Sequence, residues 1–190
     1  MKSDLLKSLR ITIVFCVIFS LFAVILWAFA HVFTPNKGQV EVVTLHGKIV
    51  GADNVGQAFK KNIYFWGRPS AANYQADASS GSNKGPTNAA YLKDVKARID
   101  TFVINHPYLK RSEVPAEMVT ASGSGLDPDI TPQSAYVQVK RVAMARRMNE
   151  EAVKAIVDKQ IEKPLFGLFG PAKVNVLKLN VALDKSNLRN

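Results

Sequence analysis

The sequence predicts an α+β protein in which one N-terminal transmembrane helix is followed by a single extracytoplasmic domain of helices packed on a small sheet. Three observations support this fold class. A long uncharged apolar run stands near the N-terminus. Three later segments place a helix-capping residue before apolar residues at helical spacing, and several short segments have the β-branched composition of strands.

The membrane helix is predicted from Ile11 to Phe33, a run of 23 residues without Asp, Glu, Lys or Arg. As a helix rising about 1.5 Å per residue, it is long enough to cross a hydrocarbon core roughly 30 Å thick. A cleaved signal peptide is the alternative, because Ala28-Phe29-Ala30 has the small-residue pattern of a cleavage site. The apolar run exceeds the ~7–15 residues of a signal-peptide core, so a retained anchor is favoured.

The charges before this run predict its orientation. Lys2, Lys7 and Arg10 precede it and are opposed only by Asp4. Basic flanks remain on the cytoplasmic side of a membrane, so we expect residues 1–10 in the cytoplasm and everything after the helix outside. Residues 34–38 then form a linker, and residues 39–190 form the extracytoplasmic domain.

The first part of this domain is predicted to contain two strands and a long loop. Residues 39–45 are β-branched and partly alternating, and residues 48–50 are a candidate second strand. Residues 73–88 are too rich in Ser, Gly, Asn and Pro for a regular element. A loop of this length inside a small domain is usually functional or mobile.

Three helices are predicted after three capping residues, Asn88, Thr131 and Asn149. They are expected to end at His106-Pro107, near Met148 and at Pro164, and Ile161 is expected in the buried stripe of the last one. Residues 174–184 alternate between apolar and polar with one change of phase. This pattern predicts a strand with a bulge near Val176-Leu177.

Composition excludes several classes of site. The chain has one cysteine, which rules out an intramolecular disulfide or a multi-thiolate zinc site, and its three histidines do not favour a metal cage. The net charge of +10 is scattered rather than concentrated, the tightest basic group being Arg141, Arg146 and Arg147. A solvated basic face near anionic headgroups is favoured over nucleic-acid binding.

Two Gly/Ser-rich loops lack the catalytic motifs that their composition suggests. In residues 79–88 the lysine precedes Gly85-Pro86, so the loop lacks the order of a phosphate-binding loop. Neither Ser122 nor Ser124 stands at the centre of a G-x-S-x-G motif. His46 and His106, the histidines outside the membrane run, are expected to be at the surface or partly buried rather than general bases. We therefore expect no catalytic site and no metal site in this chain.

Taken together, the fragments resemble the C-subunit family of the bacterial Kdp-type potassium-transporting ATPase. The resemblance runs from the anchor to the C-terminal segment. Each fragment alone is a weak signal, but the set of fragments, in this order behind one anchor, is specific. It is carried by GADNVGQAF at 51–59, YFWGRPSA at 64–71, the loop at 79–88, VPAEMVTASGSGLD at 114–127, ITPQ at 130–133, QVKRVAMAR at 138–146 and the segment 174–184.

The resemblance implies a function in high-affinity, ATP-driven potassium uptake across the bacterial inner membrane. The implied partners are a channel-like potassium-selective subunit, a P-type ATPase subunit and a small single-helix subunit, besides membrane lipid. The chain itself would be an accessory, non-catalytic subunit that stabilises the assembly and supports the ATPase subunit, a role described as a catalytic chaperone. No tightly bound cofactor is expected.

The alternative implied by the resemblance is a nucleotide-responsive regulator. Gln138 and Arg141 would then contact ATP and raise the ATP affinity of the pump. The predicted topology conflicts with this role, because it places both residues outside the membrane, where cytoplasmic ATP does not reach them.

The resemblance also marks candidate interface or structural residues, and it contains departures. Members often have Leu at position 84 and Pro at position 140, where this chain has Lys84 and Lys140. The missing proline predicts a more continuous helix around residues 138–146. The candidate interface or structural residues are Arg68, Ser80, Ser82, Asn83, Asn88, Thr120, Ser122, Ser124, Asp127 and Arg146.

Overall fold

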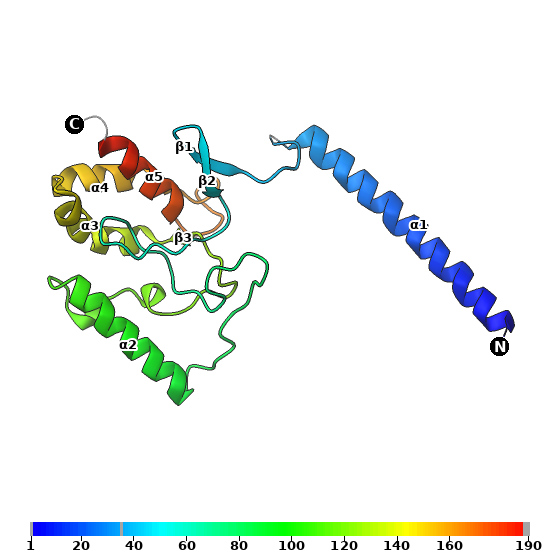
Figure 1. Cartoon of the computed structure of the whole chain (residues 1–190), viewed down its shortest axis with the longest axis horizontal. Coiled ribbons are helices and arrows are strands. Elements are labelled where there is room, and N and C mark those ends of the chain that lie inside the picture. The colour runs from blue at the N-terminus through cyan, green and yellow to red at the C-terminus, as the bar shows by residue number, and fades with distance from the viewer. Residues whose placement is uncertain (1, 35, 188–190) are drawn as a thin grey trace. The chain divides into compact units, whose positions relative to one another are not determined.

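The computed structural model describes residues 2–34 and 36–187, and it confirms the predicted α+β class. The chain divides into two units, residues 1–41 and residues 42–190, and each is described by itself. The first unit is dominated by one long helix, and the second contains the remaining helices and both sheets (Figure 1).

Helix α1 (Lys2–Phe33) contains the whole predicted membrane run and begins nine residues earlier. Ser3–Phe33 is long and apolar enough to span a membrane, and its most apolar stretch is not buried against any other part of the described chain. The turn that follows caps its C-terminal end, because Thr34 Oγ1 donates to Ala30 O at 2.7 Å and accepts from Gly38 N at 2.6 Å. The described residues of the predicted linker, 34 and 36–38, therefore include a hydrogen-bonded turn, and residue 35 lies outside the described residues.

The second unit begins with the two predicted strands. β1 (Val42–Leu45) pairs antiparallel with β2 (Lys48–Ala52), so that Val42 lies opposite Ala52. His46 and Gly47 form the tight turn between them with positive φ at both residues, the geometry that matches the twist of a two-residue hairpin. β1 starts three residues later than predicted, and β2 extends two residues further.

A second, three-stranded sheet has the order β3-β5-β4, with both pairs antiparallel. Helices α3, α4 and α5 gather on one side of this unit, and α2 lies apart from them (Figure 1). The elements are β3 (Asp129–Ile130), β4 (Ile161–Glu162), β5 (Lys173–Asn175), α2 (Ala89–Asn105), α3 (Pro132–Arg146), α4 (Glu150–Lys159), α5 (Val176–Asn187) and two single 3₁₀ turns, η1 (Arg111–Glu113) and η2 (Ala116–Met118).

All three predicted helix caps are confirmed. The side chain of Asn88 accepts from Tyr91 N, that of Thr131 from Ser134 N and that of Asn149 from Glu151 N. α3 runs without interruption through Lys140, as the absence of proline predicts. α4 ends at Lys159, earlier than predicted, and Ile161 belongs to β4.

The predicted strand at 174–184 is wrong beyond its first residues. Only Lys173–Asn175 is extended, and the chain then turns directly into α5. Asn175 accepts from Lys178 N at 3.0 Å, so it satisfies one free amide of the first helical turn. Val176, Leu177, Leu179, Val181 and Leu183 are all buried, so the phase change is a strand-to-helix junction rather than a bulge.

The core of the second unit is built by side chains of α3, α4, α5 and the three-stranded sheet, joined by Phe65 and by Phe102 of α2. The order β3-β5-β4 brings the C-terminal strand between two strands that precede it in the chain. The largest fully buried apolar side chains are Phe65, Ile130, Val142, Val153, Val157, Val174, Leu179 and Leu183.

Candidate functional site

Arg141, predicted as a possible ATP contact, is a buried cation held by neutral acceptors. It lies on α3 with 5% of its surface exposed. Its guanidinium donates from Nη1 to Asn62 O and Tyr64 O at 2.6 and 3.0 Å, from Nη2 to Gln138 Oε1 at 2.8 Å, and from Nε to His106 Nε2 at 2.9 Å. Burial lowers the pKa of Arg141 to about 10, so the side chain stays charged at neutral pH.

Gln138, one helical turn before Arg141, is fully buried and uses its whole amide inside the fold. Its Oε1 accepts from Trp66 N and from Arg141 Nη2, both at 2.8 Å. Its Nε2 donates to Ser134 O at 3.0 Å and to Trp66 O at 3.2 Å. A nucleotide contact through this side chain would require these bonds to break first.

His106 completes this network. Its burial differs from the surface or partly buried position that the sequence analysis predicts. It is fully buried at the end of α2, beside the rings of Phe102, Trp66 and Tyr108. Its Nδ1 contacts Phe102 O at 2.7 Å, and its Nε2 accepts from Arg141. Burial, with the nearby Arg141 charge, lowers the pKa of His106 to about 4. The imidazole is therefore neutral, with its proton on Nδ1.

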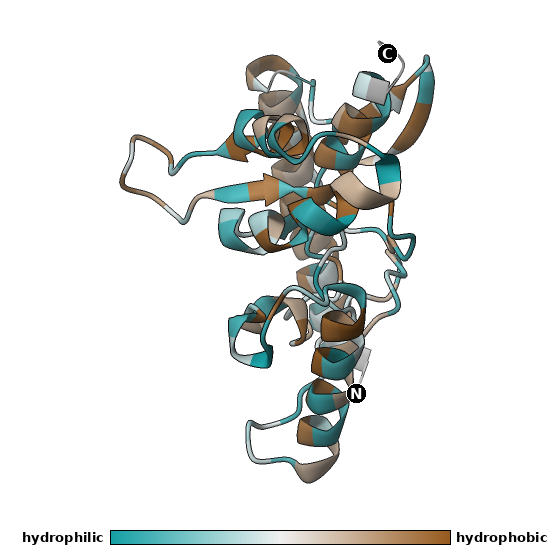
Figure 2. Cartoon of the chain, turned by 90° about the vertical axis from the view of Figure 1, so that its left-hand side faces the viewer, coloured by the Kyte–Doolittle hydropathy of each residue, from teal (hydrophilic) through white to brown (hydrophobic). Residues whose placement is uncertain are grey.

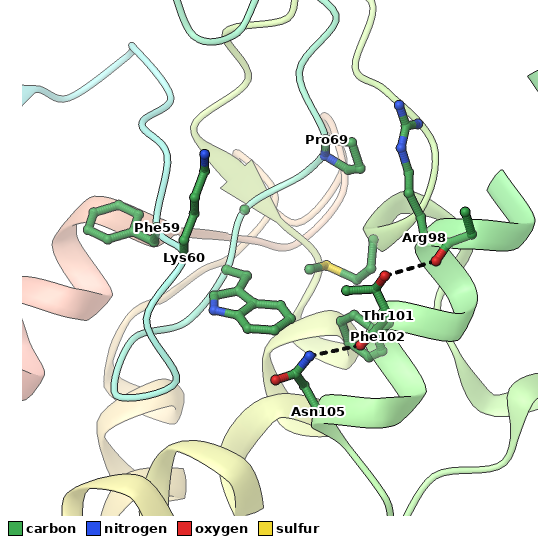
Figure 3. Close-up of a pocket in the computed structure, with 11 residues that line it drawn as sticks. Phe59, Lys60, Pro69, Arg98, Thr101, Phe102 and Asn105 are labelled. Atoms are coloured by element: carbon green, nitrogen blue, oxygen red, sulfur yellow. Dashed lines mark hydrogen bonds between the residues drawn. The ribbon is translucent and has the colours of Figure 1, made fainter. Parts of the chain in front are cut away.

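The network fixes Trp66, which forms a wall of an apolar pocket. Gln138 holds both backbone groups of Trp66, and the Arg141 guanidinium lies 4.2 Å from the centre of its ring. The pocket has a volume of about 480 Å³ and lies between α2 and residues 59–69. Figure 3 shows Lys60 and Arg98 on opposite sides of it.

The lining of this pocket does not support acid–base or nucleophilic chemistry. Most of its walls are apolar, with Phe59, Trp66, Phe102 and Met118 among them, and none of the residues that line it carries a carboxylate, imidazole or thiol. Thr101 donates to Ala97 O within α2. Across the described residues, no three His, Cys, Asp or Glu side chains converge on a point where a metal ion could bind.

The Gly/Ser loops form a second cluster, the loop junction, made of residues 68–72, 79–81 and 122–127. Arg68 Nη1 donates to Asp127 Oδ2 at 2.9 Å, and Ser122 N donates to Pro69 O at 3.1 Å. Ser80 N and the Ser79 hydroxyl both donate to Ser124 O, at 2.9 and 3.0 Å. Each of these bonds joins residues more than forty positions apart in the sequence.

Glycine is required where the loop junction is tightest. Gly125 has φ +69°, and a Cβ there would lie 2.7 Å from Ser80 O and 2.8 Å from the Cβ of Ala72. A Cβ on Gly81 would lie 2.8 Å from Gly123 O. The glycines of the two loops therefore allow their backbones to approach closely.

The remaining candidate residues have separate local roles. Ser124 Oγ accepts from Leu126 N, and Thr120 Oγ1 donates to Ala116 O. Asn83 has φ +50° and is exposed, and Ser82 beside it is half-buried. Lys84, where the family often has Leu, forms an exposed ion pair with Asp94 at 3.3 Å.

Arg146 belongs to a third polar group, at the C-terminal end of α3. Its Nη2 donates to Asp184 Oδ1 at 2.7 Å, and its Nε donates to Ile63 O at 2.5 Å. Tyr64 donates to Asp184 Oδ2 at 3.1 Å, and the Arg146 guanidinium lies over its ring. Arg141 and Arg146 therefore both hold residues 62–66 against α3, although they do not share a site with the loop junction.

Asp127 of the loop junction and the nearby Asp129 are both paired with basic side chains of this chain. Asp127 binds Arg68, and Asp129 Oδ2 binds Lys173 Nζ at 2.8 Å. Their charges are thus neutralised within the fold, which does not favour a site for a free cation.

Comparison with known proteins places the chain in a family. The model of the family KdpC, described as K⁺-transporting ATPase, c chain, matches residues 5–185. The chain is 68% identical over 184 residues to a potassium-transporting ATPase KdpC subunit of Bacteroides fragilis, covering 95% of this chain and 96% of that one. It is 50% identical over 183 residues to the KdpC subunit of Flavobacterium psychrophilum, covering 96% and 98%. The chain therefore belongs to the KdpC family of potassium-transporting ATPase subunits.

Proposed function

We propose that this chain serves potassium uptake as a non-catalytic subunit that stabilises the assembled ATPase. The observation that carries the proposal is the use of its polar side chains. Gln138, Arg141, Arg68 and Asp127, which a ligand site would need free, are bonded to other parts of the same domain. They build a fixed shape, which suits a subunit that holds others in place.

The anchor supports the same function. The large apolar side chains along α1, from Leu5 to Phe33, are more than half exposed within the chain. Lipid or helices of other subunits must cover them, since exposed apolar surface of this extent is not stable in water. The resemblance implies a channel-like subunit, a P-type ATPase subunit and a small single-helix subunit as the partners in the bilayer.

Orientation follows from the charges at the start of α1. Lys7 and Arg10 flank its apolar stretch at the N-terminal side. We therefore place the N-terminus in the cytoplasm and residues 42–190 outside the inner membrane. In this orientation the outer domain supports the ATPase subunit through assembly, because the ATP that the pump hydrolyses is on the other side.

Deletion of the outer domain tests this function. A chain truncated after Phe33 keeps α1 and is co-expressed with the other subunits, beside the full-length chain as control. We expect the truncated chain to give a strongly reduced yield of intact complex and little potassium-dependent ATPase activity. Unchanged assembly and unchanged transport would refute the proposal.

A further inference from the structure

The hairpin between β4 and β5 ends in an apolar tip that no part of the described chain covers. Its four large side chains, Leu165, Phe166, Leu168 and Phe169, are 63%, 82%, 81% and 65% exposed. Figure 2 shows the hairpin projecting from the domain at the left, with its tip coloured as hydrophobic. This feature is independent of the buried networks described above.

The backbone of the tip forms hydrogen bonds with itself. Leu165 and Phe169 exchange two backbone hydrogen bonds, each 3.0 Å long. Gly167 N donates to Pro164 O, and Leu168 N donates to Leu165 O. Four of the amides at the tip are thus satisfied internally, which lowers the cost of moving the tip out of water.

The tip carries no charge that would oppose contact with lipid. Residues 164–172 contain no Asp, Glu, Lys or Arg. Lys163 flanks the tip on one side, and Lys173 flanks it on the other, paired with Asp129 and Glu162. Aromatic and leucine side chains between flanking lysines are the composition of segments that lie in a membrane interface.

The base of the hairpin lies close to the point where the chain arrives from its anchor. Lys178 Nζ lies 3.6 Å from Glu162 Oε1, at the start of the hairpin, and 2.7 Å from Asp53 Oδ2. Asp53 follows Ala52, which is paired with Val42, the first residue of the domain. The chain from Phe33 to Val42 spans at most roughly 30 Å when extended, and this length limits how far the base of the hairpin can move from the end of α1.

We propose that Leu165, Phe166, Leu168 and Phe169 insert into the interfacial layer of the bilayer that holds α1. The hairpin then provides a second point of attachment, beside the covalent anchor. Two attachments restrict how the outer domain can rotate about its short tether, so the face presented to the other subunits is fixed by the membrane.

Site-specific labelling of the full-length chain tests this attachment. Cys16 is replaced by Ser, since it is the only cysteine, and Leu168→Cys is labelled with an environment-sensitive fluorophore. Met144→Cys is the matched control, because Met144 is also a large apolar residue, 69% exposed, but on α3. Each chain is reconstituted at one copy per nanodisc of phosphatidylcholine and phosphatidylglycerol, without other subunits.

We expect the label at position 168 to show blue-shifted emission, quenching by lipids with nitroxides near the headgroup, and loss of quenching by aqueous iodide. The label at position 144 should show the opposite behaviour. Equal iodide quenching at both positions would overturn the proposal. Protection of position 168 only after the other subunits are added would also overturn it, because the tip would then bind a protein partner.

Discussion

The Arg141 network and the tip of the β4–β5 hairpin reverse the usual distribution of side chains. In the first region a cation, an amide and an imidazole are buried and bonded to one another. In the second region four large apolar side chains are exposed. Gln138, Arg141, Arg68 and Asp127, which the family resemblance marks, are therefore bonded within the fold, whereas the tip of the hairpin leaves an apolar surface exposed.

Replacement of Arg141 should have the largest effect on the buried region. Arg141→Met removes the Arg141 donor from the carbonyls of Asn62 and Tyr64 and from His106 Nε2, and it removes one of the two donors to the Gln138 amide oxygen. We expect a loss of about 3–5 kcal/mol in the free energy of unfolding. Urea unfolding of the full-length chain in detergent measures it. Lys140→Met, the exposed neighbour, is the control and should change stability by less than about 0.5 kcal/mol.

Substitution of one phenylalanine in each region compares them directly. Phe102 is 3% exposed, so Phe102→Ala should cost about 3–5 kcal/mol through lost burial and the cavity it leaves. Phe166 is 82% exposed, so Phe166→Ala should change the free energy of unfolding by no more than about 0.5 kcal/mol. The same denaturation assay serves both variants. Equal losses would show that the tip is part of the folded core.

Acid should weaken the buried region through His106. The pKa of His106 is lowered to about 4 in the folded chain, so only the unfolded chain takes up this proton as the pH falls through about 6.5. The contribution of neutral His106 to the free energy of unfolding is fully present above that pH. It is lost progressively down to about pH 4, by about 2–3 kcal/mol. Urea midpoints at pH 7.5 and 4.5 measure the loss. His106→Asn should show a smaller difference between the two, whereas an identical pH dependence would exclude His106.

Gly125→Ala should destabilise the loop junction by about 2 kcal/mol, because its φ is positive and its Cβ has no space. Gly85→Ala is the control, since a Cβ there meets nothing within 4 Å. Thermal unfolding of the two variants measures the difference. A variant at position 125 as stable as the one at position 85 would show that the loops are not closely packed.

Local signals predicted much of the fold. Asn88, Thr131 and Asn149 were identified as caps from residue type and the apolar spacing that follows, and the structure confirms each. The segment 174–184 was predicted incorrectly because it is buried on nearly every side. Because apolar residues face the core on most sides, their spacing shows neither a helical nor a strand period. Asn175 is the one local sign of a helix start in this segment.

The sequence identifies the candidate residues but does not predict their hydrogen-bond partners. Arg141, Gln138, Arg68 and Asp127 were singled out, but their bonds join segments that are 59 to 79 residues apart in the sequence. No local pattern specifies such pairs. The burial of His106 likewise depends on α3 packing against the end of α2, which the sequence around His106 does not reveal.

An ATP titration tests whether the buried polar residues stabilise the fold or bind a nucleotide. Full-length chain in detergent is titrated with ATP by calorimetry, beside Gln138→Ala, with the folded state of both checked by circular dichroism. We expect no saturable binding to either chain and lower thermal stability for Gln138→Ala. Saturable binding to the unmodified chain that is lost in Gln138→Ala, with both chains folded, would contradict this expectation.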